Sequence, residues 1–297
     1  MAEQKCSFVA ILGAPNAGKS TLLNYIIGSK ISIVSPKVQT TRGKVRGIYI
    51  NDNTQLILVD TAGIFKPSRR LDRAMVAGAW TESDDADMRL VLIDAKKGLD
   101  DNTNLIIQNL TKAKQKAVLA INKIDQVTPT KLATLAAAVG KMELWNAIFY
   151  VSAKTGKGVQ ELMDYLCSKA SKSPWMFNPD EMTDMPDRLF AAEVTREKLF
   201  MNLQNELPYH LTVETTSFKE TENSIRIEQN IIVERTAHRM IILGRGGQMI
   251  KKIGQQSRIE LTKQLGKKVS LFLFVKVREN WAEDPNQYKP WGLDFNA

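Results

Sequence analysis

The sequence predicts an α/β chain in which a mostly parallel sheet with helices on both faces is followed by a smaller α+β domain. Three observations support this prediction. A glycine-rich loop joins an apolar strand to a helix at residues 13–20, and strands and helices then alternate as far as residue 172. A Gly-x-x-Gly tetrad then lies between two helical segments in the last third. The length of 297 residues also fits about two domains.

The glycine-rich loop is the first element with a chemical meaning. Residues 13–20 read Gly-Ala-Pro-Asn-Ala-Gly-Lys-Ser, the G-x-x-x-x-G-K-S pattern of a phosphate-binding loop. An apolar strand at 8–12 precedes it and a helical segment at 21–27 follows it, which is the context that the motif requires. Its glycines let backbone amides close around phosphate oxygens at the positive end of a helix dipole. Lys19 can reach the β- and γ-phosphates, and Ser20 can bind Mg²⁺.

A polar loop and a pair of strands come next. Residues 31–47 are polar and contain proline and glycine, which predicts a loop, and the segments 45–50 and 55–60 predict paired strands. The second strand runs into Asp-Thr-Ala-Gly. The carboxylate of Asp60 can hold Mg²⁺ through water, and the backbone amide of Gly63 can meet a γ-phosphate.

Two further buried strands are predicted at 89–94 and 117–121. Helical segments are predicted at 72–82, 101–113, 130–144 and 154–172. This alternation is what favours a parallel sheet with helices on both faces.

The base-recognition motifs follow the later strands. Residues 122–125 read Asn-Lys-Ile-Asp at a strand end, where ligand sites of open α/β sheets lie. Asp125 can accept two hydrogen bonds from guanine, whereas adenine lacks the 2-amino group that completes the pattern. The aliphatic part of Lys123 can cover the base. Ser-Ala-Lys at 152–154, after a strand at 149–151, suits the guanine edge. Four motifs in this order predict a P-loop GTPase domain.

The residue after Asp-Thr-Ala-Gly is Ile64, which cannot orient an attacking water as a glutamine does in Ras-type enzymes. Asn16, with Thr40 and Thr41, resembles the pattern of GTPases that have a hydrophobic residue at this position. In that group, K⁺ held by the asparagine and the first switch loop supplies the missing positive charge. The sequence therefore indicates K⁺-stimulated hydrolysis. The alternative is that Asn16 only shapes the loop.

The second half begins after a linker at 173–187, which is rich in proline. Predicted elements are a helix at 188–206, strands at 208–218 and 225–233, a helix at 237–243, the tetrad at 244–247, a helix after Gly254 and a strand at 269–277. This is the element order of a type II KH domain, whose Gly-x-x-Gly loop clamps about four single-stranded nucleotides.

The charge distribution supports nucleic-acid binding. Residues 235–278 hold eleven basic side chains and one acidic one, whereas 181–234 hold eleven acidic and five basic. Ile241, Ile242 and Ile250 can provide an apolar floor for bases. The expected RNA-binding residues are Arg239, Gly244, Arg245, Gly246, Gly247, Lys251, Lys252 and Arg258. A plain turn and a solvated basic surface are the alternatives.

The composition excludes several classes of protein. Cys6 and Cys167 form no disulfide framework and no metal-binding spacing, and two histidines argue against a histidine-based metal site or triad. No apolar run approaches the ~18 residues of a membrane helix. Since the first strand starts almost at once, we expect no signal or transit peptide.

These motifs resemble those of the Era family of bacterial ribosome-assembly GTPases, in which a GTPase domain precedes a C-terminal type II KH domain. Gln-Thr-Thr-Arg at 39–42 matches the family's first switch, and Glu-Asn-Trp at 279–281 matches the exit from its last KH strand. Two departures are Ala62, where the family has proline, and an extra glycine in Gly-Arg-Gly-Gly. The expected parts are a GTP-binding domain (1–172), the linker (173–187), the KH domain (188–280) and an aromatic tail (281–297) that packs on the KH domain or stacks on bases.

The motifs and the resemblance together imply the site residues. Nucleotide contacts are expected from Gly13, Ala14, Pro15, Asn16, Ala17, Gly18, Lys19, Ser20, Thr21, Asp60, Thr61, Ala62, Gly63, Ile64, Asn122, Lys123, Ile124, Asp125, Ser152, Ala153 and Lys154. Metal ligation is expected from Ser20, Thr41 and Asp60. The expected catalytic residues are Asn16, Lys19, Thr41 and Gly63.

The resemblance implies GTP and GDP as ligands, Mg²⁺ as cofactor and the 3′ end of 16S ribosomal RNA on the maturing 30S subunit as partner. It also implies a cytoplasmic protein, in part peripherally associated with the inner membrane, and we expect a monomer. In the switch that we expect, GTP orders residues 35–43 and 63–73 and hydrolysis releases them.

Four other functions fit parts of the sequence. A tRNA-modification GTPase would need a C-terminal catalytic cysteine, and none follows Cys167. A GTP-regulated protein acting on another RNA stays open. An enzyme that uses GTP as phosphoryl donor would need an acceptor site, and an RNA-binding module without activity leaves the four motifs unexplained.

Overall fold

The computed structural model describes residues 3–38 and 40–297, so Gln39 of the predicted first switch lies outside the described residues. The chain forms two compact units. The first contains the described residues up to Ser32, together with Thr41–Asp184 and Trp291–Ala297. The second contains Ile33–Thr40 and Met185–Pro290. Compared with the predicted limits, the first unit also includes most of the predicted linker and the segment 291–297, and the second also includes the segment 33–40 and residues 281–290 of the predicted tail.

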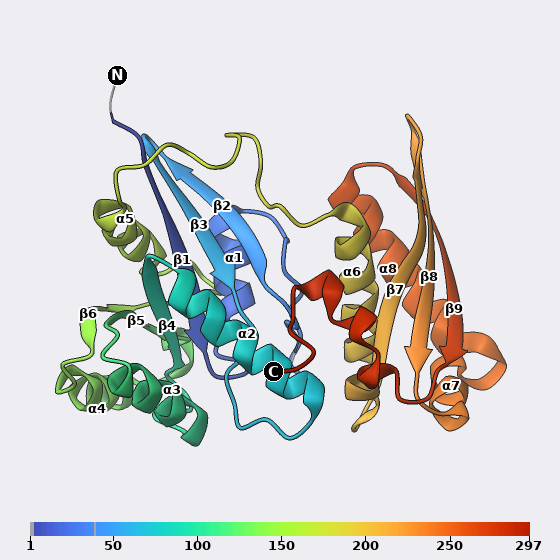
Figure 1. Ribbon diagram of the computed structural model, residues 1–297, viewed down its shortest axis with the longest axis horizontal. Helices are drawn as coiled ribbons and strands as arrows, with labels where there is room; N and C mark the ends of the chain where they lie inside the picture. The colour runs from blue at the N-terminus through green and yellow to red at the C-terminus, as the bar shows by residue number, and fades with distance from the viewer. Residues whose placement is uncertain (1–2, 39) are drawn as a thin grey trace. The chain divides into compact units, whose positions relative to one another are not determined.

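The first unit is built on a six-stranded sheet in the order β2-β3-β1-β4-β5-β6 (Figure 1). Its strands are β1 (Lys5–Gly13), β2 (Val45–Asn51), β3 (Thr54–Asp60), β4 (Met88–Asp94), β5 (Ala117–Asn122) and β6 (Trp145–Tyr150). Only the β2–β3 pair is antiparallel among these strands. Every residue of β3 and β5 is buried, because helices cover both faces of the sheet. The predicted, mostly parallel architecture is confirmed.

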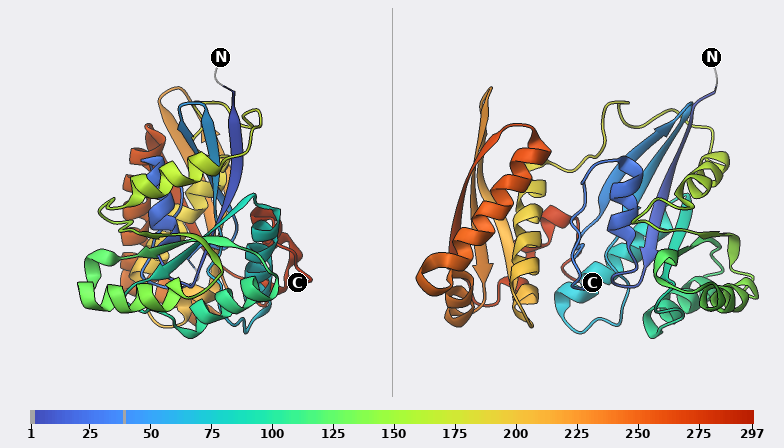
Figure 2. Two further views of the ribbon diagram at one scale, coloured as in Figure 1. Left: turned by 90° about the vertical axis from the view of Figure 1, so that its left-hand side faces the viewer. Right: turned by 180° about the vertical axis from the view of Figure 1, so that it is seen from behind.

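Five helices cover this sheet: α1 (Lys19–Ile27), α2 (Arg70–Asp85), α3 (Asp101–Lys112), α4 (Pro129–Gly140) and α5 (Val159–Lys169). Apolar residues of α2, α3 and α4 share one core with β1, β4 and β5, and α1 and α5 lie on the opposite face (Figures 1 and 2). Capping residues fix the N-termini of two of these helices. The Asp100 side chain caps α3, and the Thr128 side chain caps α4 ahead of Pro129. The parallel strands thus end at one edge, which is where the predicted motifs lie.

The second unit has a three-stranded sheet in the order β7-β8-β9, with β7 and β8 antiparallel and β8 and β9 parallel. Its elements are α6 (Asp187–Asn202), β7 (Leu211–Glu220), β8 (Ser224–Val233), α7 (Thr236–Leu243), α8 (Gln248–Leu265) and β9 (Lys268–Val277). This confirms the predicted type II KH order. One detail differs, because Gly254 lies inside α8 rather than before a new helix. A Cβ there would be 3.5 Å from Leu273 Cδ1, an ordinary contact distance, so packing against β9 does not require a glycine at this position.

The aromatic tail is divided between the two units. Trp281 and Tyr288 are buried in the second unit, where the Trp281 indole donates to the carbonyl oxygen of His210 at 3.3 Å. The Tyr288 hydroxyl donates to the carbonyl oxygen of Ala282 at 2.7 Å. These two rings therefore pack on the protein and are not exposed for base stacking. Within residues 3–38 and 40–297, no helix combines the length and the apolar character needed to cross a membrane.

Candidate functional site

The phosphate loop is tightly wound between the end of β1 and the start of α1. Asn16 has a φ of 63° and Gly18 a φ of 99°, both in the left-handed region. A Cβ on Gly18 would stand 2.3 Å from the Asn122 side-chain nitrogen, so this position accepts only glycine without displacement. The loop therefore has the backbone shape that the motif predicts.

Lys19 lies at the inner side of this loop and is only 6% exposed. Its ammonium donates to the carbonyl oxygens of Gly13 at 3.1 Å and Ala14 at 3.3 Å. Burial lowers the pKa of Lys19 to about 8, although the nearby Asp60 carboxylate acts in the opposite direction. Nearby negative charge therefore only partly offsets the cost of burying the ammonium, and the oxygens of a bound phosphate would supply the rest.

Three hydroxyl groups converge on one carboxylate oxygen at the end of β3. Asp60 Oδ2 accepts from Ser20 at 2.6 Å, Ser32 at 2.9 Å and Thr41 at 3.3 Å, and the Ser20 and Thr41 hydroxyls are 3.0 Å apart. Asp60 Oδ1 is buried and has no hydrogen-bond partner among the described residues. Burial raises the pKa of the Asp60 carboxyl, against the opposing effect of Lys19 and the three hydroxyls.

The predicted metal residues Ser20, Thr41 and Asp60 are therefore together. Their donors are oxygen atoms, which Mg²⁺ prefers, and the unpartnered Asp60 oxygen leaves a place for metal-bound water. The donor set fits Mg²⁺. Ser32 was missed in the sequence analysis because it is one serine in a polar loop.

The Asp-Thr-Ala-Gly turn packs directly on the phosphate loop. A Cβ on Gly63 would be 3.0 Å from backbone atoms of Pro15, so any larger residue would crowd the phosphate loop. Thr61 is buried, and its hydroxyl donates to a carbonyl oxygen of β1 at 2.8 Å. Ile64 faces away from the phosphate loop's open side. Its backbone amide donates to the carbonyl oxygen of Gly13 at 3.1 Å, and its side chain is fully buried in the core. Its side chain therefore cannot orient a water molecule.

Asn122 joins the base motif to the phosphate loop. Its side-chain amide donates to the carbonyl oxygen of Ala17 at 2.8 Å. Its Oδ1 accepts from the amides of Lys123 at 2.8 Å and Ala153 at 2.9 Å. Asn122 is almost fully buried and aligns three segments of the site, and its amide has a second N–H beyond the one that donates to Ala17.

The other base-motif residues point to the open end of β5. Lys123 has a φ of 65°, and its ammonium contacts the Asn16 carbonyl oxygen at 2.6 Å and Asp94 Oδ2 at 2.7 Å. Asp94 ends an apolar strand as Asp60 does, a signal that could have identified it from sequence. Asp125 is exposed, and its Oδ1 accepts from the Ser152 hydroxyl at 2.6 Å. That bond lowers the pKa of Asp125 and keeps its carboxylate an acceptor for guanine.

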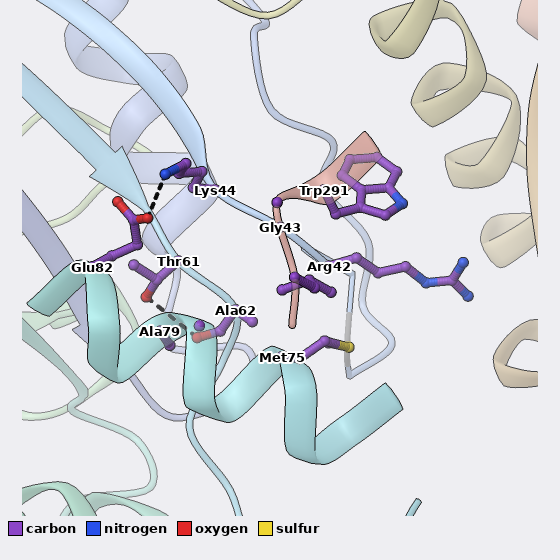
Figure 3. A pocket seen from close by; sticks show the side chains of 12 residues that line it. Arg42, Gly43, Lys44, Thr61, Ala62, Met75, Ala79, Glu82 and Trp291 are labelled. Atoms are coloured by element: carbon purple, nitrogen blue, oxygen red, sulfur yellow. Dashed lines mark hydrogen bonds and ion pairs between the residues drawn. The ribbon is translucent and has the colours of Figure 1, made fainter. Parts of the chain in front are cut away.

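The end of the tail belongs to the first unit and lies beside residues 42–44 and α2 (Figure 3). A Cβ on Gly43 would be 2.7 Å from the Trp291 carbonyl oxygen, and the Phe295 ring lies 4.5 Å from the Arg70 guanidinium. The hollow lined by Arg42, Lys44, Thr61, Ala62 and Trp291 has a volume of about 20 Å³. That volume holds about one water molecule, so this hollow is not a nucleotide site.

The Gly-x-x-Gly tetrad links α7 to α8 with three left-handed glycines. Gly244, Gly246 and Gly247 have φ values of 71°, 58° and 77°. A Cβ on Gly244 would be 2.7 Å from the Met249 Cβ, whereas Gly246 and Gly247 face open space. The basic RNA-site residues are all exposed on α7, the tetrad and α8: Arg239, Arg245, Lys251, Lys252 and Arg258.

The predicted apolar floor needs a correction. Ile242 is fully buried in the core of the second unit, and Ile250 packs partly against that core. Ile241 and Met240 are the exposed apolar side chains of α7, at 54% and 63%. The helical spacing of α7 turns Ile242 inward because its apolar face must cover the sheet.

Comparison with known proteins agrees with this geometry. A family model described as a 50S ribosome-binding GTPase matches residues 8–123, and a KH-domain model matches residues 206–282. GTPase Era of Bradyrhizobium sp. strain BTAi1 is 52% identical over 295 residues, which cover 99% of this chain and 96% of that protein. GTPase Era of Brucella suis is 48% identical over 294 residues, or 99% of this chain and 94% of that protein.

Two solved structures are also similar. A variant of Aquifex aeolicus Era bound to GDP and AlF4⁻ matches with a TM-score of 0.91 and 36% identity, covering 97% of this chain and 99% of that chain. Era in complex with MgGDPNP and nucleotides 1506–1542 of 16S ribosomal RNA matches with a TM-score of 0.91, 37% identity and the same coverage.

Proposed function

Because this chain belongs to the Era family of GTPases and hydrolyses GTP, we propose that it is a switch that binds the 3′ end of 16S ribosomal RNA through its KH domain. In this role it assists maturation of the 30S ribosomal subunit. The observation that carries the proposal is the placement of the first switch segment. Thr41 reaches Asp60 in the first unit, while the residues just before it, 33–40, belong to the unit that contains the KH elements.

In the nucleotide site, each residue has a separate task. Lys19 neutralises charge on the β- and γ-phosphates, and the Gly63 amide donates to the γ-phosphate. Asp125 selects guanine. Ser20 and Thr41 would hold Mg²⁺ directly and Asp60 would hold it through water, and the bound Mg²⁺ would supply positive charge at the phosphates.

Hydrolysis needs a group other than residue 64, because the Ile64 side chain lies in the core. We infer that Asn16 and the first switch loop hold K⁺ against the phosphates. The support is that Asn16 lies in the phosphate loop itself, with a left-handed backbone that is uncommon for a non-glycine residue. A cation there would stabilise charge that develops in the transition state.

The switch segment is held by α6. The amide of Val34 donates to Glu197 Oε1 at 2.9 Å, and the Lys37 ammonium donates to the Phe200 carbonyl oxygen at 2.6 Å. Segment 33–40 directly precedes Thr41, so release of Thr41 from the metal site after hydrolysis would strain or break these bonds to α6. The nucleotide can then shift the RNA-binding unit only through the difference in binding free energy between the two arrangements.

The test is RNA co-purification with the protein held first in a non-hydrolysable GTP analogue and then in GDP. The control is a double variant, Arg245→Asp with Gly246→Asp, which places negative charge in the tetrad. We expect 16S 3′-end fragments to be enriched with the GTP analogue, less so with GDP, and not with the double variant. Enrichment that the double variant leaves intact would overturn the RNA assignment, and equal enrichment with both nucleotides would overturn the switch.

We infer a cytoplasmic monomer that works on the 30S subunit, with a fraction peripherally bound to the inner membrane. Cell fractionation and analytical ultracentrifugation test these two points separately.

A further inference from the structure

The hydrogen bonds at Asp60 are unevenly distributed between its two oxygens. Three hydroxyls, from Ser20, Ser32 and Thr41, contact Oδ2, while Oδ1 is buried with no partner in the described part of the chain. A carboxylate oxygen has two lone pairs, so three donors exceed what Oδ2 accepts well. At least one hydroxyl is therefore available for another acceptor or for a metal.

Ser32 differs from the other two donors because it has no place among the predicted metal ligands. It is 2% exposed, and it lies just after α1 rather than in a motif. Asn24 of α1 fixes its backbone on both sides. The Asn24 Oδ1 accepts from the amides of Ile31 at 3.0 Å and Ser32 at 2.9 Å, and its Nδ2 donates to the Ser32 carbonyl oxygen at 2.7 Å.

This arrangement gives Ser32 a fixed direction toward Asp60. Its backbone is anchored to the helix that begins at Lys19, so the hydroxyl stays in place independently of the switch segment. Ser20 and Thr41 would turn their hydroxyls toward Mg²⁺ on binding. The Ser32 hydroxyl would then be the donor that still holds Oδ2 and leaves Oδ1 to face metal-bound water.

We propose that Ser32 is a positioning residue for the Mg²⁺ site, which acts by holding the Asp60 carboxylate in its metal-binding orientation. This inference rests on the Mg²⁺–nucleotide site of the proposed function. Groups that orient metal ligands commonly contribute about tenfold or more to metal affinity, although they do not touch the metal.

The experiment measures how free Mg²⁺ slows release of a fluorescent GDP analogue, with Ser32→Ala, Ser32→Thr and Ser83→Ala compared with the unaltered chain. Ser83 is a matched control, since it is fully buried in α2 and its hydroxyl has no partner in the described ranges. We expect Ser32→Ala to raise the Mg²⁺ concentration of half-maximal effect about tenfold. Ser32→Thr, which keeps the hydroxyl, should restore most of the effect, and Ser83→Ala should leave it unchanged.

The positioning role is overturned if Ser32→Ala leaves the half-maximal Mg²⁺ concentration unchanged while its melting temperature matches that of the Ser83→Ala control. An equal shift in Ser32→Thr and Ser32→Ala also overturns it, because the shift would then not follow the hydroxyl. If Ser32→Ala does not fold, Ser32→Cys keeps the approximate side-chain size with a much weaker donor, so the half-maximal Mg²⁺ concentration should still rise, and a value equal to that of Ser32→Thr overturns the role. If the unaltered chain shows no Mg²⁺ effect or no GDP binding, the proposed nucleotide site fails instead.

Discussion

The side-chain amide of Asn122 donates to the carbonyl oxygen of Ala17 at 2.8 Å, so the first residue of the base motif is bonded to the phosphate loop. The same side chain accepts from the amide of Ala153 at 2.9 Å. The phosphate half and the base half of the site therefore form one hydrogen-bonded assembly. A substitution in the phosphate loop should therefore alter binding of the base, and a substitution in the base motif should alter binding of the phosphates.

Gly18→Ala tests this assembly. The new Cβ would stand 2.3 Å from the Asn122 nitrogen at a φ of 99°, so both the loop and the Asn122 bond would have to move. We expect GDP affinity to fall about fivefold or more, since the buried Asn122 amide would lose its partner at a cost of about 1–3 kcal/mol. Isothermal titration calorimetry measures the affinity.

Gly140→Ala is the matched control for this prediction. Gly140 ends α4, has no positive φ, and a Cβ there would meet nothing within 4 Å. GDP affinity should be unchanged in that variant. Equal GDP affinity in the Gly18 and Gly140 variants would contradict the argument.

Lys19 should make nucleotide binding depend on pH. Its pKa is lowered from 10.5 to about 8, so between these values the folded, nucleotide-free chain binds fewer protons than the unfolded chain. The contribution of Lys19 to folding stability therefore rises with pH in this window. Phosphate favours the charged ammonium, so GDP binding should take up protons there and weaken as pH rises.

Proton uptake is measured by calorimetry in two buffers with different ionisation enthalpies, at a pH between those two values and without Mg²⁺. Lys19→Arg is the control, because a guanidinium stays protonated at this pH. Its complex should show no uptake. The same uptake in both proteins would assign the proton to another group.

Ser152→Ala should weaken guanine recognition and leave the contacts to the phosphates unchanged. The lost bond to Asp125 is charge-assisted, with a net contribution of about 1.5–3 kcal/mol, so GDP affinity should fall about tenfold or more. The pKa of Asp125 would move back up toward its usual range. The loss of GDP binding on acidification should then begin at a higher pH than in the unaltered chain.

The measurement is the ratio of GDP to ADP affinity by competition with a fluorescent nucleotide. Ser168→Ala is the control, since that exposed hydroxyl donates to the Tyr165 carbonyl oxygen on α5, away from the site. A drop in GDP and ADP affinity by the same factor would show that Ser152 supports the fold of the site rather than base selection.

Hydrolysis should be faster in K⁺ than in Na⁺ at equal ionic strength. Asn16→Ala should abolish the difference while GTP is still bound, because the proposed K⁺ would lose a ligand. Single-turnover phosphate release measures this. Equal rates in the two salts, or a salt effect that survives in Asn16→Ala, would leave Asn16 as a residue that only shapes the loop.

The sequence predicted the parts of the site that lie in continuous motifs. The phosphate loop, the turn at Gly63 and the tetrad at 244–247 depend on local backbone geometry, and glycine at particular positions indicates that geometry directly. Asp94 was missed although it ends an apolar strand, because its role depends on contact with Lys123, which directly follows the neighbouring strand β5. Ile242 was assigned to the wrong surface, since adjacent residues on a helix face different directions.

The sequence by itself determined the order of elements, the guanine-nucleotide chemistry and the position of the basic tetrad. Each of these depends on residues that are neighbours in the chain and on their periodicity. Only the tertiary structure decided that Ser32 shares Asp60 with Ser20 and Thr41, and that Ile64 turns into the core. Packing of the sheet brings these strand ends and loops together, and burial then selects which side chains face inward. Such contacts depend on distances between segments that are remote in sequence, so no local pattern records them.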